Sequence, residues 1–238
     1  MRRGRGKVGR TQEYLKQIVF GGNDGIVTTF AIVAGFAGAQ ADGAGQIGAI
    51  AVLVFGLANL MADAVSMGLG EFLSGRSQRD LYRHQSAEIH RDVLDDPKAA
   101  QHRLIRFLHE RGLGDDDARK AGDLLSREPA LMFDILLHYD KKVRPPDGNT
   151  PVLNGLVTFL SFVVFGVIPL LPYFVMAATD RALVFSVIAT VFALLSLGVL
   201  RWSATAEGAL RAVGETVLVG SVCAVVAFLV GMLVGSSG

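Results

Sequence analysis

Five stretches of the 238-residue chain are long and apolar enough to cross a membrane, and they constrain its fold more than any other feature. A membrane-spanning helix needs about 20 mostly apolar residues, because its backbone must satisfy its own hydrogen bonds in lipid. The stretches are Gln17–Ala39, Gln46–Leu73, Val152–Met176, Ala182–Leu200 and Leu210–Val234. The sequence therefore predicts an all-α integral membrane protein with five transmembrane helices.

Charged residues are concentrated between positions 76 and 150, which hold more than half of the Lys, Arg, Asp and Glu residues. We expect the second transmembrane helix to continue into this block through about Asp92. Asp96 and Pro97 are then typical of an N-cap and a first helical position, so a new helix begins there. The block is predicted to be a three-helix insert between transmembrane helices two and three. The predicted parts are an N-terminal membrane part (1–75), the insert (76–150) and a C-terminal membrane part (151–238).

The positions of Lys and Arg predict the orientation, because cytosolic loops carry an excess of both. Six basic residues precede the first helix, the next loop has none, and the C-terminal tail has none. The N-terminus and the insert are therefore predicted to lie in the cytosol and the C-terminus outside. No cleavage site of the signal-peptide type follows the first apolar stretch, so we expect it to be retained. Arg-rich flanks favour a bacterial plasma membrane.

Several function classes fit the composition poorly. The net charge is +1 and the insert is charge-balanced, whereas a nucleic-acid protein needs a basic face. The only cysteine is Cys223, which excludes an intrachain disulfide and a cysteine-based metal site. No Ser/His/Asp, Cys/His or phosphate-loop pattern is present. We therefore expect neither an enzyme nor a protein with a bound cofactor.

Three acidic residues lie inside the predicted membrane helices: Asp24, Asp63 and Glu71. An ionised carboxylate at the bilayer centre costs about 3 kcal/mol, so it is tolerated where it faces a partner, a cation or water. In the second helix Asn59, Asp63, Met67 and Glu71 follow one another at intervals of four residues, which is a rotation of about 40° per step. The pattern predicts one polar stripe that faces another helix or a pore.

The residue types of this stripe indicate a substrate. Carboxylate oxygens suit hard and borderline cations, and a thioether adds little for Mg²⁺ or Ca²⁺. A mixed site of this kind favours Fe²⁺ or Mn²⁺, and intramembrane carboxylates also carry protons. Metal transport with proton exchange is one interpretation. A structural polar patch that joins helices is the other.

Three segments resemble the vacuolar iron transporter family. They are Gly-Asn-Asp-Gly-Ile-Val-Thr-Thr-Phe at 22–30, the stretch from Asn59 through the Ser66-Met67 pair to Ser74, and Gly155–Pro172 with its Gly-Val-Ile-Pro-Leu run. The resemblance covers the whole chain, including five membrane helices and a helical cytosolic insert.

This resemblance implies a homodimer that moves Fe²⁺ or Mn²⁺ out of the cytosol, in exchange for protons. Its path would run between the subunits and use Asp24 and Met67. Some members have Glu where this chain has Asn59, and we expect Asp63, one turn along, to replace that carboxylate. Glu71 would shape ion entry or pass protons. The expected partners are divalent metal ions, protons, membrane lipids and a second subunit, with the metal as transported substrate.

The insert departs from the family pattern. The positions that gather metal in other members fall here on Ile89, Asp92, Ala100, Arg103 and Asp140, of which only two are acidic. Glu88 stands nearby, so Glu88, Asp92 and Asp140 are the candidate cytosolic ligands. Ordinary solvated ion pairs are the alternative, with Arg103 occupying an acid. The departure also keeps open a second function, a non-transporting, membrane-anchored metal-binding or sensory module.

Overall fold

The computed structural model describes residues 14–39, 45–140, 150–176, 181–204 and 208–236, and every regular element in these ranges is a helix. Five helical spans in this part of the chain have the length and composition needed to cross a membrane. They are Leu15–Ala39, Gly48–Asp95, Pro151–Met176, Ala182–Ser203 and Ala209–Gly235. The predicted all-α, multi-pass architecture is confirmed.

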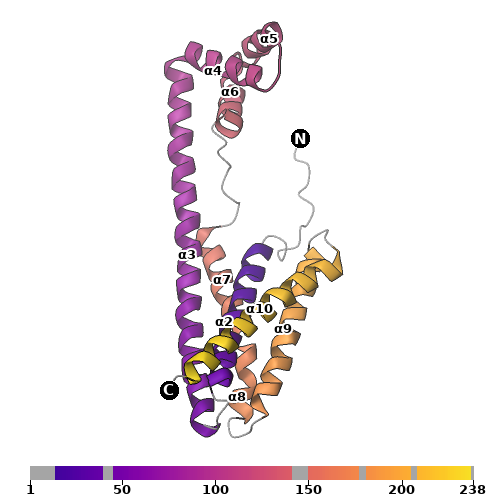
Figure 1. Cartoon of the computed structure of the whole chain (residues 1–238). Helices are drawn as coiled ribbons and strands as arrows, with labels where there is room; N and C mark the ends of the chain where they lie inside the picture. Colours follow the sequence, from indigo (N-terminus) through magenta and orange to yellow (C-terminus); the bar gives the residue numbers. More distant parts are fainter. Residues whose placement is uncertain (1–13, 40–44, 141–149, 177–180, 205–207, 237–238) are drawn as a thin grey trace. The chain divides into compact units, whose positions relative to one another are not determined.

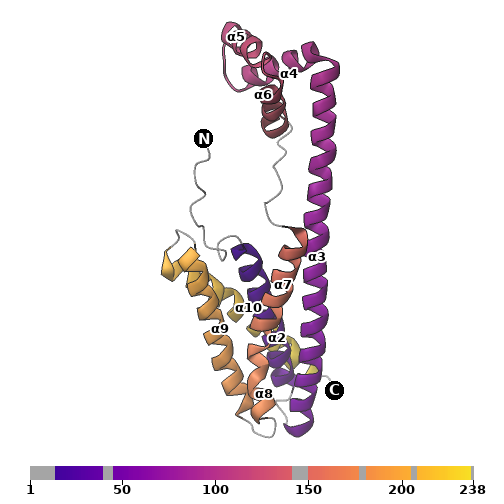
Figure 2. The same cartoon turned by 180° about the vertical axis from the view of Figure 1, so that it is seen from behind.

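The chain divides into two compact units, residues 1–72 with 149–238 and residues 73–148. In the first unit α2 (Leu15–Ala39) packs against α7 (Pro151–Gly166), α9 (Ala182–Ala204) and α10 (Ala209–Gly235). Figures 1 and 2 show α2 among these helices from opposite sides. Its central place follows from the glycines in its sequence, because small residues let membrane helices approach closely. A Cβ on Gly21, for example, would lie 2.7 Å from the backbone oxygen of Thr158.

The longest element is α3 (Gly45–Asp95), with 51 residues. At 1.5 Å per residue it is about 77 Å long, more than twice the hydrocarbon thickness of a bilayer. No Gly or Pro follows Gly75 until Pro97, so nothing in that stretch breaks the helix. The predicted continuation beyond the membrane segment is confirmed, and it extends three residues past Asp92.

The third span is interrupted, although the sequence predicts a single segment at Val152–Met176. Helix α7 ends at Gly166, a 3₁₀ turn η2 covers Ile168–Leu170, and α8 covers Leu171–Met176. Pro169 causes the break, since its ring removes a backbone donor and clashes with the preceding turn. The fully buried Ser186 of α9 donates a hydrogen bond of 2.6 Å to the Pro169 carbonyl. A neighbouring side chain thus donates to a backbone oxygen at the interruption, which suits a membrane interior.

The second unit contains the end of α3, α4 (Pro97–Glu110), α5 (Asp115–Leu125), α6 (Pro129–Ile135) and the π-helix η1 (Leu136–Asp140). The Asp96 side chain accepts a hydrogen bond of 3.0 Å from the Ala99 amide, which confirms the predicted N-cap of α4. A separate hydrophobic core holds this unit together. Its fully buried members include Ile89, Leu104 and Leu136, which lie on α3, α4 and η1.

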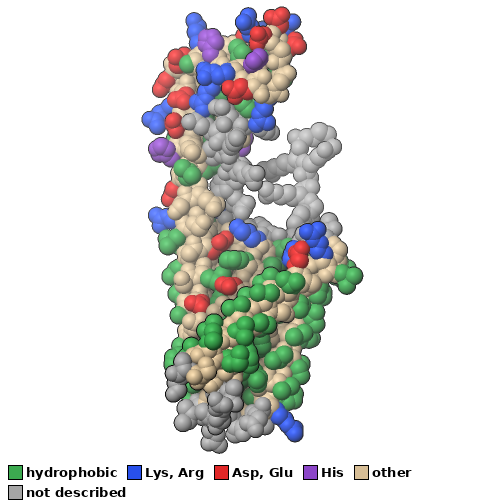
Figure 3. Space-filling view, in the orientation of Figure 1, with side chains coloured by type: hydrophobic (Ala, Val, Ile, Leu, Met, Phe, Trp, Pro, Cys, Tyr) green, Lys and Arg blue, Asp and Glu red, His purple; other side chains and the backbone are tan. Residues whose placement is uncertain are grey.

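The surfaces of the two units differ in chemistry (Figure 3). Hydrophobic side chains cover α9 and α10, whereas Lys, Arg, Asp and Glu side chains gather on the second unit. Phe192 of α9 is 69% exposed and Leu233 of α10 is 70% exposed. Exposed apolar side chains at this density indicate a surface that meets lipid or another apolar partner. The first unit is therefore the part that lies in the membrane.

Candidate ion site within the membrane-spanning helices

The polar stripe of α3 is present, and its four side chains are all partly buried. Asn59 and Asp63 are joined by a hydrogen bond of 2.7 Å, from the Asn59 amide nitrogen to a carboxylate oxygen of Asp63. A donor at i−4 holds one oxygen of the carboxylate in place and leaves the second oxygen for another ligand. The first two members of the stripe therefore form one unit.

Asp24 of α2 interacts electrostatically with this pair. Its carboxylate accepts a hydrogen bond from Thr28, one turn along α2, and its charge is repelled by that of Asp63. Two carboxylates inside a membrane protein are unfavourable together unless a cation or a proton neutralises part of their charge. Asp24 and Asp63 therefore interact electrostatically although they lie on different helices.

The side chain of Met67, the third member of the stripe, has apolar neighbours. It packs against the buried cluster of Leu60, Ala64 and Phe162, at the contact between α3 and α7. A thioether in this position fills space among apolar side chains. Among the described contacts, none joins its sulfur to Asp24 or Asp63.

Glu71, the last member of the stripe, is held by a residue that sequence reasoning missed. The Nε2 atom of Gln17, on α2, donates a hydrogen bond of 3.2 Å to Glu71 Oε1. Gln17 is only 5% exposed. The signal for it was its spacing, because Gln17 precedes Asp24 by seven residues and so lies on the same face of α2.

Asp24 also borders an open pocket of about 840 Å³ formed by α2, α9 and α10. Asn23 lines it from α2, and Arg201 and Glu215 line it from the other two helices. Glu215 accepts hydrogen bonds from Arg201 at 2.9 Å and from Arg211 at 3.0 Å. The Arg201–Glu215 pair joins the end of α9 to the beginning of α10, whereas the Arg211–Glu215 pair lies within α10. The sequence analysis did not identify Glu215.

A second groove, of about 820 Å³, lies between α2, α3 and α10 and is almost entirely apolar. Asn59 is the only polar side chain among the described residues that line it. Ala58 and Ala62 line the same side of α3 and are exposed. The beginning of the stripe therefore opens onto an apolar surface.

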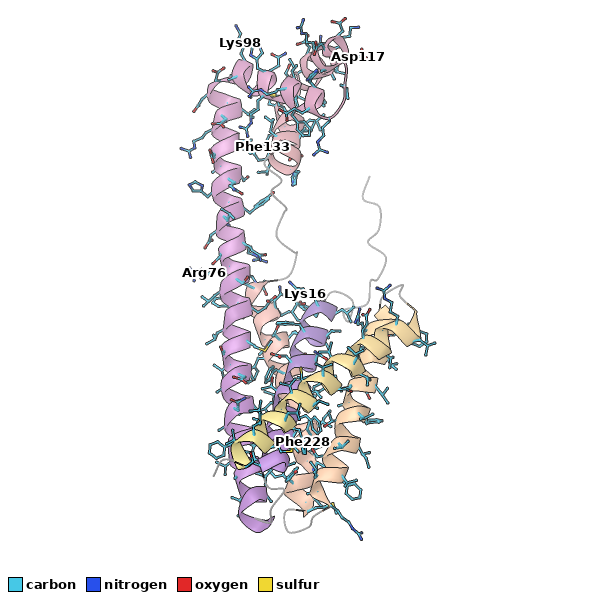
Figure 4. The ribbon with its side chains drawn as sticks, in the orientation of Figure 1. Lys16, Arg76, Lys98, Asp117, Phe133 and Phe228 are labelled. Atoms are coloured by element: carbon cyan, nitrogen blue, oxygen red, sulfur yellow. The ribbon has the colours of Figure 1, made fainter. Side chains whose placement is uncertain are left out.

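Figure 4 places Phe228 on α10 and Lys16 in the first turn of α2.

The candidate cytosolic ligands are arranged differently. Glu88 is partly buried and Asp92 is exposed, with Asp92 3.6 Å from the guanidinium of Arg103. The side chain of Asp140 lies outside the described residues. In the part of the chain that the structure describes, no three His, Cys, Asp or Glu side chains are grouped so as to hold a metal ion. Arg103 and Asp92 form the ion pair that the alternative interpretation predicts.

Comparison with known proteins gives one consistent match. A model of the VIT family matches residues 15–232. The vacuolar iron transporter of Centaurea cyanus is 30% identical, and the match covers 94% of this chain and 95% of that protein. Vacuolar iron transporter 2 of Oryza sativa subsp. japonica is 30% identical, covering 91% and 85%. The vacuolar iron transporter of Plasmodium falciparum is also 30% identical, covering 93% and 82%.

Proposed function

Because this chain belongs to the VIT family, we propose that it carries Fe²⁺ or Mn²⁺ out of the cytosol across a membrane, in exchange for protons. The observation that carries the proposal is the pair of intramembrane carboxylates, Asp24 and Asp63, on neighbouring helices. The matching relatives are named as iron transporters, which supports a metal ion as the substrate and transport rather than catalysis.

The carboxylate pair gives a physical reason for exchange. When both groups are ionised and alone, their repulsion in a medium of low dielectric is unfavourable. A divalent cation between them removes the repulsion, and so does protonation of one carboxyl group. Metal and proton therefore compete for the same two groups, which is the requirement for antiport through one site. Exchange in this form needs no covalent step.

The remaining members of the stripe set selectivity and access. Asn59 orients Asp63, and Met67 offers a thioether that favours Fe²⁺ and Mn²⁺ over Mg²⁺ and Ca²⁺. Glu71 lies two turns from Asp63, toward the second unit, where an ion arriving from the cytosol first meets the helices. The N-terminus inside and the C-terminus outside follow from the Lys and Arg distribution alone. The relatives are named for the vacuole and come from eukaryotes, so they support a multi-pass membrane protein but not a bacterial plasma membrane.

A homodimer completes the path. The apolar groove beside Asn59 and the exposed small residues Ala58 and Ala62 give a second subunit a surface to cover. Membrane lipids would then contact the apolar side chains that remain outside. Disulfide cross-linking of Ala62→Cys in a Cys223→Ser background tests this arrangement: a cross-linked dimer supports it, and a monomer under oxidising conditions opposes it.

The insert, residues 76–150, is proposed to collect metal through Glu88, Asp92 and Asp140. The Asp92–Arg103 ion pair favours the second candidate function, a membrane-anchored metal-binding or sensory module that does not transport. The two candidates differ in flux, because only the first moves metal through the spanning helices.

The test is uptake of ⁵⁴Mn²⁺ and ⁵⁵Fe²⁺ by proteoliposomes under an imposed pH gradient. Wild-type flux should depend on the gradient, and Asp24→Asn and Met67→Ala should abolish or strongly reduce it. Asp123→Asn is the matched control, because Asp123 is an exposed carboxylate of α5. Flux that survives Asp24→Asn would remove the carboxylate pair from the mechanism. A folded protein without flux would favour the sensory module.

A further inference from the structure

Three amide oxygens of the first unit are buried without a hydrogen-bond partner among the described residues: Gln17 Oε1, Asn23 Oδ1 and Asn154 Oδ1. Gln17 and Asn154 are the two of these residues that are buried as a whole. The two residues are 5% and 8% exposed. A buried acceptor without a donor costs about 1–3 kcal/mol, so such atoms are rare unless a water or an ion completes them.

The register of α2 and α7 places both residues at one level. Gly21 lies against the backbone of Thr158, and Gly25 against that of Phe162, so the two helices run in the same direction. Gln17 is one turn before Gly21, and Asn154 is one turn before Thr158. Gln17 and Asn154 therefore lie at the same level on the facing sides of α2 and α7, near the beginning of each helix. Figures 1 and 2 show where these two helices begin.

The third helix brings a carboxylate to the same level. Gly68 of α3 lies against Gly155 of α7, and the Cβ of Phe72 would be 3.2 Å from a Cβ on Gly155. Glu71 is adjacent to Phe72 and receives the hydrogen bond of 3.2 Å from Gln17 Nε2. The amide nitrogen of Gln17 is used in this hydrogen bond, and its Oε1 is the atom left without a partner among the described residues.

We propose that Gln17, Glu71 and Asn154 form a divalent-cation site inside one subunit. This inference rests on the proposed function, since it adds an entry site to the transport path. Two amide oxygens and a carboxylate are hard ligands that suit Mn²⁺ and Fe²⁺ with water completing the coordination. A cation bound here would be a partner for both Gln17 Oε1 and Asn154 Oδ1. Its binding does not require Asp24, Asp63 or Met67.

The charge of the site suits transient binding of an ion on a transport path. One carboxylate does not neutralise a divalent ion, so binding is weaker than in a storage site. Conduction requires such sites, because an ion that binds too tightly does not leave. Glu71 is one turn of α3 away from Met67, so an ion released from this site is next to the stripe.

The first test counts Mn²⁺ bound to the purified full chain, by equilibrium dialysis with electron paramagnetic resonance of the free ion. We expect Asn154→Leu to need at least about tenfold more Mn²⁺ for half-occupancy of one site per subunit, since a ligand oxygen is lost. Thr29→Val is the matched control, because Thr29 is also buried on α2 and its Oγ1 has no partner among the described residues. Binding by Asn154→Leu equal to wild type would overturn the proposal.

A second variant keeps the test decisive if Asn154→Leu does not fold. Asn154→Asp replaces the amide oxygen by a carboxylate, so Mn²⁺ should bind more tightly and raise the melting temperature further than in wild type. Unchanged affinity would show that water alone fills the site. In the metal-free protein, Asn154→Leu should melt no lower than wild type, because it removes an unpaired acceptor.

The proposed function is tested separately by flux through the Asp24–Asp63 pair. Flux that is intact in wild type, together with identical Mn²⁺ binding in wild type and Asn154→Leu, rejects only the entry site. Loss of Mn²⁺ binding in Asn154→Leu, with no wild-type flux, keeps the site and rejects the transport proposal.

Discussion

Replacement of Gly68 by alanine should separate α3 from α7 and disturb the polar stripe between Met67 and Glu71. A Cβ at Gly68 would lie 2.9 Å from the Cβ of Phe159 and 3.0 Å from the backbone oxygen of Gly155. Ordinary contact begins near 3.4 Å, so the helices must move apart by about half an ångström. One of the two opposing atoms is backbone, and it cannot rotate away.

The size of the effect follows from two opposing contributions. Overpacking costs about 1–3 kcal/mol, whereas alanine in a helix is about 1 kcal/mol more favourable than glycine. We therefore expect Gly68→Ala to lower the free energy of unfolding by about 0–2 kcal/mol. Gly214→Ala on α10 is the matched control, since no heavy atom of the described residues lies within 4 Å of a Cβ there. It should gain about 1 kcal/mol.

Thermal unfolding in detergent measures the difference. One kcal/mol shifts the melting temperature by about 2–4 °C in a chain of this size, so Gly68→Ala should melt several degrees below Gly214→Ala. Metal flux should fall in Gly68→Ala and stay at the wild-type level in Gly214→Ala. Equal melting temperatures for the two variants would refute the close contact of α3 with α7.

Three further predictions follow from single side chains. Asp63→Asn should reduce Mn²⁺ flux at least about tenfold, because one charge of the carboxylate pair is lost, and radiotracer uptake measures this. Ser186→Ala should lower the free energy of unfolding by about 0.6–1.7 kcal/mol, since the Pro169 carbonyl loses its donor, while the exposed Ser221→Ala should change it little. Asp96→Ala should lower the stability of the second unit by about 1 kcal/mol in thermal unfolding followed by circular dichroism, because α4 loses its N-cap. An unchanged value in any of these would reject the contact concerned.

The hydropathy of the sequence predicts the spans because every helix that crosses lipid must consist mostly of apolar residues. The continuation of α3 is equally predictable, since the stretch from Arg76 to Asp96 has no Gly or Pro. The sequence-based prediction of one continuous segment missed the interruption at Pro169, although a proline inside a predicted helix is a known cause of a break. Hydropathy counts apolar side chains. It carries no information on whether Ser186 of another helix will donate a hydrogen bond to the Pro169 carbonyl oxygen at the interruption.

The spacing of the polar stripe on α3 can be predicted from the sequence, whereas its neighbours on other helices cannot. Four residues at intervals of four turn by about 40° each, so Asn59 and Glu71 differ by about 120° around α3. The stripe therefore meets different neighbours along its length: Asp24 near Asp63, the apolar cluster at Met67, and Gln17 at Glu71. Gln17 and Asn154 were missed because a single amide in an apolar stretch gains meaning only when the pairing of α2, α3 and α7 is known.

Simultaneous measurement of metal and protons tests the central claim most directly. Vesicles that contain the purified protein and a pH-sensitive dye are given Mn²⁺ outside, and metal uptake and the internal pH are followed in the same sample. The account predicts that metal entry and proton exit begin together, and that Asp24→Asn abolishes both. Metal entry without any proton movement, or equal movement in Asp24→Asn vesicles, would contradict exchange through the carboxylate pair.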